Sequence, residues 1–102
     1  MAYGDSAEII EALAADIGDS IYMDIAKWHL YLRDAHLHTL LAEKFYPIII
    51  DGDLTETTVV QILNDIPVKL GGGRRTVPLS ELIPVQGQVN LIDLLESHQG
   101  KL

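Results

Sequence analysis

The sequence is a small acidic chain of 102 residues with a formal net charge of −8 at neutral pH. This length suits a single domain over residues 1–102, and its 48% of apolar residues can supply a hydrophobic core. The lack of cysteine excludes disulfides, thiolate metal sites and cysteine nucleophiles. The negative charge opposes binding to phosphate backbones and to anionic membranes, so we expect no nucleic acid among the partners and no general affinity for an anionic membrane.

No segment of the sequence has the character of a secretory signal or a membrane span. The stretch from Met1 to Asp5 has neither a basic nor an apolar region. The longest aliphatic run, Ile48–Ile50, is far shorter than the ~20 apolar residues of a membrane span. We therefore expect a cytoplasmic protein without a membrane span.

Helix-type spacing of apolar residues runs through most of the chain. It predicts a first helix over residues 6–17 and a second, much longer helix over residues 20–46. Pro47 is expected to end this long helix, because the residue before a proline disfavours helical backbone. Shorter helices are predicted over residues 53–64 and 91–98.

The segment over residues 66–79 predicts a β-hairpin instead. Short β-branched runs flank three consecutive glycines, Gly71–Gly73, where the chain is expected to turn. A lone hairpin is only marginally stable in water, so we expect this one to lie against the helices or to pair with another chain. The predicted fold class is therefore α+β and mainly α, a helical bundle with one long central helix and a small two-stranded hairpin.

The predicted long helix carries the first candidate site. On a helical wheel it is apolar around most of its circumference, yet Tyr22, His29, Arg33 and His36 fall within about 60° of one another opposite its polar face. Buried arginine and histidine are costly unless they are paired. In one interpretation, acids of the first helix pair with Arg33 and the histidines are satisfied core or interface groups. In the other, the four residues line a ligand site in which Arg33 holds a carboxylate or phosphate.

The glycine turn carries a second candidate site, for an anion. Its members are Lys69, Gly71, Gly72, Gly73, Arg74 and Arg75. Glycine permits positive φ, so the turn can present successive N–H groups to an anion beside three basic side chains. The turn lacks the Lys-Ser/Thr of a Walker A loop. A flexible hairpin tip kept soluble by basic residues is the alternative interpretation.

Metal and catalytic constellations are not evident in the sequence. His29 and His36 are seven positions apart, which is about 10 Å along a helix and unsuited to a shared zinc ion. None of the serines lies in a G-x-S-x-G motif. We expect no metal, no cofactor and no catalytic residue. The aromatics at helical spacing are interpreted as core residues: Tyr22, Trp28, Tyr31, Phe45 and Tyr46.

Two strings resemble a known family. They are AKWHLYLRDAHLH over residues 26–38 and IPVKLGGGRR over residues 66–75. Both are similar to a family of small uncharacterised cyanobacterial proteins, described as a domain of unknown function. The resemblance covers nearly the whole chain and implies a cytoplasmic or thylakoid-associated cyanobacterial protein. It supplies no catalytic residues.

The features together favour a non-enzymatic binding protein, such as an adaptor, a regulator or an assembly factor with an unidentified protein partner. The broadly apolar long helix predicts a homodimer, because one chain has too few other helices to cover it. The alternative is a small-ligand or anion sensor that uses Arg33, His29 and His36 or the Gly71–Gly73 turn. An enzyme is the third choice and rests only on His29 and His36 as proton carriers.

Overall fold

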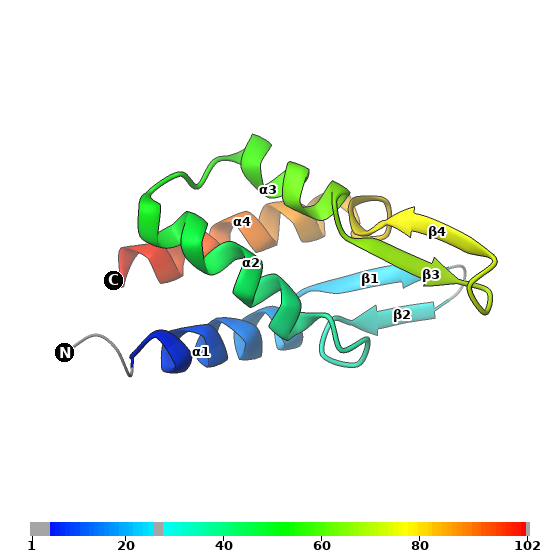
Figure 1. The fold of residues 1–102 in the computed structure, drawn as a ribbon, viewed down its shortest axis with the longest axis horizontal. Helices are drawn as coiled ribbons and strands as arrows, with labels where there is room; N and C mark the ends of the chain where they lie inside the picture. Colours follow the sequence, from blue (N-terminus) through cyan, green and yellow to red (C-terminus); the bar gives the residue numbers. More distant parts are fainter. Residues whose placement is uncertain (1–4, 26–27, 102) are drawn as a thin grey trace.

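The computed structural model describes residues 5–25 and 28–101. Within these residues it contains four α-helices and two antiparallel β-hairpins, which form separate two-stranded sheets (Figure 1). In chain order the elements are α1 (Asp5–Ser20), β1 (Tyr22–Ile25), β2 (Trp28–Tyr31), α2 (His38–Asp51), α3 (Glu56–Asn64), β3 (Pro67–Leu70), β4 (Arg75–Pro78), the 3-10 helix η1 (Leu79–Glu81) and α4 (Val85–Gly100). The mainly α class and the hairpin over residues 66–79 are confirmed.

The long helix predicted over residues 20–46 is wrong. The chain leaves α1 at Ser20, forms the hairpin β1–β2, and begins α2 only at His38. The backbone N–H of Leu32 donates to the carbonyl oxygen of Ile21 at 2.9 Å, which closes the base of this hairpin. The chain therefore reverses direction where the helical wheel placed a continuous rod.

The reason for this hairpin lies in an alternation of period two. Ile21 and Met23 are buried, whereas Tyr22 is half-buried and Asp24 is exposed. A helix would turn Ile21 and Met23 about 160° apart, but an extended chain places both on one face. Burial of that face against the core therefore selects a strand over a helix.

The prediction that Pro47 ends a helix is also wrong, because α2 continues through Pro47 to Asp51. A proline inside a helix removes one backbone hydrogen bond. Two features sustain the helix beyond it. Phe45 and Ile49, one turn apart, are both buried in the core, and Gly52 caps the end at a left-handed φ of 75°. Burial and the cap together outweigh the lost hydrogen bond.

The last helix is longer than predicted, since α4 begins at Val85 rather than near residue 91. Gly87, which precedes the predicted start, is a buried helical residue. A Cβ atom placed on Gly87 would lie 2.9 Å from Cγ2 of Ile83, so the glycine allows α4 to start close to the preceding turn. Tight packing at this point extends the helix toward its N-terminus.

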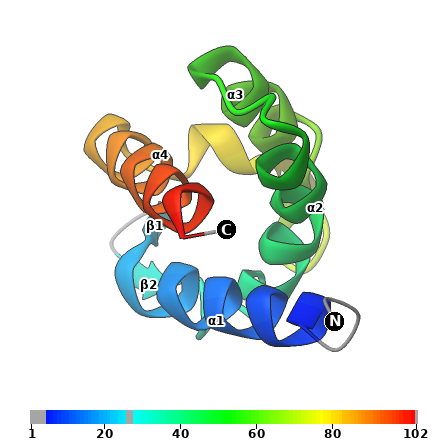
Figure 2. The same cartoon turned by 90° about the vertical axis from the view of Figure 1, so that its left-hand side faces the viewer.

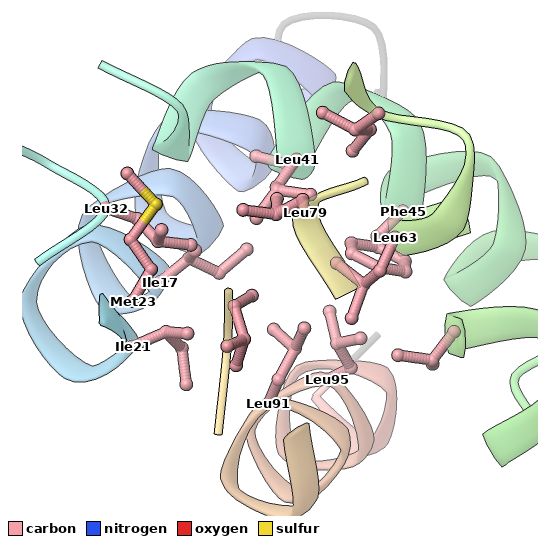
Figure 3. Packing of buried hydrophobic residues seen from close by; sticks show 14 of the residues in the cluster. Ile17, Ile21, Met23, Leu32, Leu41, Phe45, Leu63, Leu79, Leu91 and Leu95 are labelled. Carbon is pink, nitrogen blue, oxygen red and sulfur yellow. The ribbon is translucent and has the colours of Figure 1, made fainter. Parts of the chain in front are cut away.

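The four helices enclose one hydrophobic core. Figure 2 shows them arranged around the interior when the molecule is viewed along its long axis. Figure 3 shows core side chains from α1, α2, α3 and α4 directed toward one another. The bases of both hairpins join this core through Met23, Leu32 and Leu79, while the strands run outward from it. Fully buried members include Leu13, Ile17, Ile21, Leu32, Leu41, Phe45, Leu63, Leu79, Leu91 and Leu95.

A nearly buried histidine fastens the last helix to the first. His98 of α4 is only 8% exposed, and its Nε2 lies 2.6 Å from Oδ2 of Asp16 on α1. This hydrogen bond gives the buried ring the polar partner that burial requires. It joins the C-terminal part of α4 to α1.

The contact between α1 and the turn before α2 is unusually close at Gly18. The N–H of Arg33 donates to the carbonyl oxygen of Gly18 at 3.3 Å. A Cβ atom on Gly18 would lie 2.9 Å from Cβ of Arg33 and 3.2 Å from Cβ of His38. Both obstacles are attached directly to backbone, so they can yield little without moving the chain.

We expect the Gly18→Ala substitution to lower the free energy of unfolding by about 1–3 kcal/mol, because the added methyl group overpacks this contact. At an open helical site the same substitution stabilises by up to about 1 kcal/mol. Gly100→Ala is the matched control, since a Cβ there meets no atom within 4 Å. Urea unfolding measures both variants. A Gly18→Ala variant as stable as the wild type contradicts the close approach.

Candidate functional site

Two of the four residues predicted on one helical face meet instead on the hairpin β1–β2. The rings of Tyr22 and His29 have centroids 3.9 Å apart, and Tyr31 lies edge-on to both. Nδ1 of His29 lies 2.9 Å from Oδ1 of Asp24, its partner in the strand register. Both side chains of this pair are about half exposed. The result is an aromatic and ionic cluster on the outer face of the hairpin.

The other two residues, Arg33 and His36, lie in the turn between β2 and α2. Nη1 of Arg33 is 2.5 Å from Oδ1 of Asp19 on α1, so an acid of the first helix does pair with it. His36 is exposed and has a left-handed φ of 59°. The premise that the arginine and the histidines are embedded in a helix surface is wrong, because His29 and His36 are exposed and the Arg33 side chain is 61% exposed.

A cavity of about 360 Å³ opens beside the Asp19–Arg33 pair, between α1 and the start of α2. Glu11 and His38 also line it. Among the described residues, Nδ1 of His38 is a buried side-chain nitrogen without a hydrogen-bond partner. Two carboxylates face one guanidinium here, so the charge balance does not favour an anion.

The three glycines of the second candidate site lie between β3 and β4, with φ values of 61°, 71° and 93°. Two N–H groups of this connection are already engaged within it. The N–H of Gly73 donates to the oxygen of Leu70 at 3.1 Å, and that of Arg74 to the oxygen of Gly71 at 3.4 Å. These two N–H groups are therefore not available to an anion, and the anion site at Gly71–Gly73 stays a prediction.

The basic side chains of this hairpin are exposed and form no ion pair with a described acid. Lys69, Arg74 and Arg75 all lie on the surface, and the segment over residues 66–80 contains no acid. Among the residues that the structure describes, no carboxylate forms an ion pair with any of the three. The hairpin β3–β4 is thus a cationic projection on a chain of net charge −8.

Sequence reasoning missed the exposure of Trp28. It was assigned to the core by helical spacing, as Phe45 was, but Trp28 is 70% exposed while Phe45 is fully buried. Trp28 is the first residue of β2 and pairs with Ile25, the last residue of β1. Its position beside the turn of a hairpin, which the alternation over residues 21–25 could have indicated, carries it beyond the core.

The described part of the chain contains no evident set of metal ligands. Over residues 5–25 and 28–101, no group of three histidine, aspartate or glutamate side chains lies close enough to hold an ion. The small-anion site at Arg33 stays a prediction, and Asp19 is the group that an incoming anion would have to displace.

Because Asp19 neutralises Arg33, we expect 10 mM phosphate or succinate to raise the melting temperature of the wild type by less than about 1 °C. Asp19→Asn frees the guanidinium, so its melting temperature should respond more strongly to the same anions. Arg33→Gln provides the control that cannot respond at this site. A large shift in the wild type that Arg33→Gln abolishes would instead identify an anion sensor.

Comparisons with known proteins assign the sequence to a family. A family model described as "Protein of unknown function (DUF3181)" matches residues 10–98. The "Thylakoid-associated protein slr0729" of Synechocystis sp. (strain ATCC 27184 / PCC 6803 / Kazusa) is 44% identical over 92 residues, which cover 90% of this chain and 91% of that protein. No solved structure matches the chain. The resemblance to a cyanobacterial family is thereby confirmed, and the chain belongs to the DUF3181 family of proteins of unknown function.

Proposed function

We propose that this chain is a non-enzymatic binding protein, an adaptor, regulator or assembly factor, that acts on the cytoplasmic side of cyanobacterial thylakoid membranes. The observation that carries the proposal is the concentration, at one end of the molecule, of an exposed tryptophan and three exposed basic side chains beside partly buried aliphatic residues. We call this surface the hairpin end, and it comprises Ile25, Trp28, Lys69, Leu70, Arg74 and Arg75. A large exposed aromatic beside unpaired cations is typical of an interaction surface rather than of a solvated one.

The arrangement of the elements isolates this surface from the rest of the molecule. In Figure 1 the end of β1, the start of β2 and the turn between β3 and β4 lie at one end of the long axis, whereas α1 begins and α4 ends at the other. The name of the Synechocystis relative adds a location, the thylakoid. None of the described helices combines the length and the apolar character needed to cross a bilayer. We therefore propose attachment through a surface contact.

Fractionation of cyanobacterial cells tests the location. We expect the chain to sediment with thylakoid membranes at low ionic strength and to leave them in high salt, because salt screens contacts made by exposed charges. Immunodetection in the membrane and supernatant fractions measures the partition, and a lumenal and an integral thylakoid protein serve as controls. Recovery of the chain entirely in the low-salt supernatant contradicts the proposed function.

The homodimer stays a proposal, now supported by a different surface. The long helix that suggested it does not exist, but α4 exposes Val85 by 79% and Val89 by 45%. These two residues are one helical turn apart and line a shallow cavity of about 90 Å³ with Val60 of α3. A second copy that covers this stripe would remove the apolar area from water.

Light scattering measures the dimer directly. We expect the wild type at micromolar concentration to have twice the mass of one chain, and the double variant Val85→Asp/Val89→Asp to have the mass of one, because two charges would be buried in the interface. Ile50→Asp, at an apolar position of α2 that is 50% exposed, is the matched control and should stay dimeric. A wild type that scatters as a monomer removes the dimer from the proposal.

A further inference from the structure

Resting on the proposed function, we propose that the hairpin end binds directly to an anionic lipid surface. In this contact Trp28 enters the headgroup layer, while Lys69, Arg74 and Arg75 bind the negative headgroups. The lipid contact and the thylakoid location are independent of each other, since a thylakoid protein could also hold the chain at that membrane.

Both hairpin tips can reach one plane. In Figure 1 the end of β1, the start of β2 and the turn between β3 and β4 lie at the same end of the helical bundle. The strand register places Trp28 and Ile25 beside the first tip, and Leu70 and Arg75 beside the second. A flat membrane that meets this end of the long axis therefore contacts aromatic, aliphatic and basic groups together.

The basic side chains surround the second tip instead of forming one face. Leu70 pairs with Arg75, and Lys69 pairs with Thr76. Successive residues of a strand point to opposite faces, so Lys69 and Arg75 lie on opposite sides of the ribbon. Val77, which is buried, marks the side that turns to the core. Cations on both sides suit a tip that enters a headgroup layer end-on, where negative groups surround it.

The aromatic residue favours lipid over an acidic protein as the partner. Acidic side chains would account for the three cations but not for a tryptophan that is 70% exposed next to the partly buried Ile25. Tryptophan has an apolar body and one N–H donor, and it concentrates where hydrocarbon meets headgroups. Basic groups beside it add attraction to an anionic leaflet. A membrane surface uses both kinds of side chain at once.

The net charge of −8 does not cancel this attraction. The molecule is 46 Å long, and the Debye length at physiological ionic strength is about 8 Å. Acids at the far end of the bundle are therefore screened from a membrane at the hairpin end. Near the tips, the described acid of β1–β2 is Asp24, and His29 lies against it.

Tryptophan fluorescence provides a direct test, because Trp28 is the single tryptophan of the chain. We expect its emission to shift to the blue with vesicles that contain phosphatidylglycerol, and brominated lipid to quench it. Pure phosphatidylcholine vesicles and 10 mM inorganic phosphate should leave the emission unchanged. Flotation of the same vesicles gives the partition coefficient of the protein.

Charge variants separate the tip from general electrostatics. Each cation near an anionic leaflet contributes about fivefold in partition, so Arg74→Gln/Arg75→Gln should weaken binding by tenfold or more. Lys44→Gln/Lys101→Gln changes the net charge equally at sites outside the hairpin end and should bind like the wild type. Trp28→Ala should reduce flotation while leaving the urea midpoint unchanged, because the side chain lies outside the core. Circular dichroism confirms that each variant folds.

Two results would overturn the lipid contact: an absence of blue shift and flotation with anionic vesicles, or equal losses in both double variants. Combined with thylakoid sedimentation in cells, the first result leaves the proposed function intact and assigns the contact to a protein, whereas the second assigns vesicle binding to the overall charge and not to the hairpin end. Binding to anionic vesicles without thylakoid sedimentation supports the lipid contact and contradicts the proposed function. Each combination therefore identifies which of the two proposals fails.

Discussion

The reversal of the chain between Ile21 and Leu32 determines how the rest of the protein is assembled. Both residues are fully buried, and the backbone bond between them holds the base of β1–β2 against the core. The same reversal returns the chain to α1, where the turn before α2 meets Gly18. The packing of α2 on α1 follows from that contact. Without the hairpin, the apolar faces of these two helices would lie along one rod and could not cover each other.

Where local pattern and tertiary burial agree, the sequence was a good guide. The helices over residues 6–17 and 53–64 and the hairpin over residues 66–79 have periodicities that match their buried faces, and all three are present with shifted ends. The predicted ends of α2 and α4 were wrong because tertiary packing overrode the local sequence signals. Ile49 is buried beyond the proline of α2, and Gly87 lets α4 start close to Ile83.

The segment over residues 20–46 failed because two periods overlap there. Its many apolar residues fill a helical wheel almost completely, which hides the alternation from Ile21 to Ile25. A largely apolar helical wheel is weak evidence for a helix when most residues of the segment are apolar, because such a segment fits a strand period as well as a helical one. The alternation in a short window was the more specific signal, and only the burial of Met23 beside Ile21 decides between them.

Each candidate site depended on the secondary structure predicted for its residues. Arg33 does pair with an acid of α1, although its partner Asp19 lies beyond the range 6–17 predicted for the first helix. Its grouping with Tyr22, His29 and His36 depended on the wheel, and the structure divides them between the hairpin and the turn that follows. The basic residues near the glycines all lie on one short hairpin, as predicted, whereas the anion site assigned to them stays a prediction.

The separation of the four strands into two sheets has a mechanical consequence. No ladder joins one ribbon to the other over the described residues. Separate contacts hold the two ribbons: the N–H of Asp24 in β1 donates to the carbonyl oxygen of Leu82 at 2.8 Å, and Leu70 of β3 packs against the core. Two-stranded ribbons bend and twist easily on their own. Because no ladder is shared, a small shift of one ribbon does not have to break the hydrogen bonds of the other.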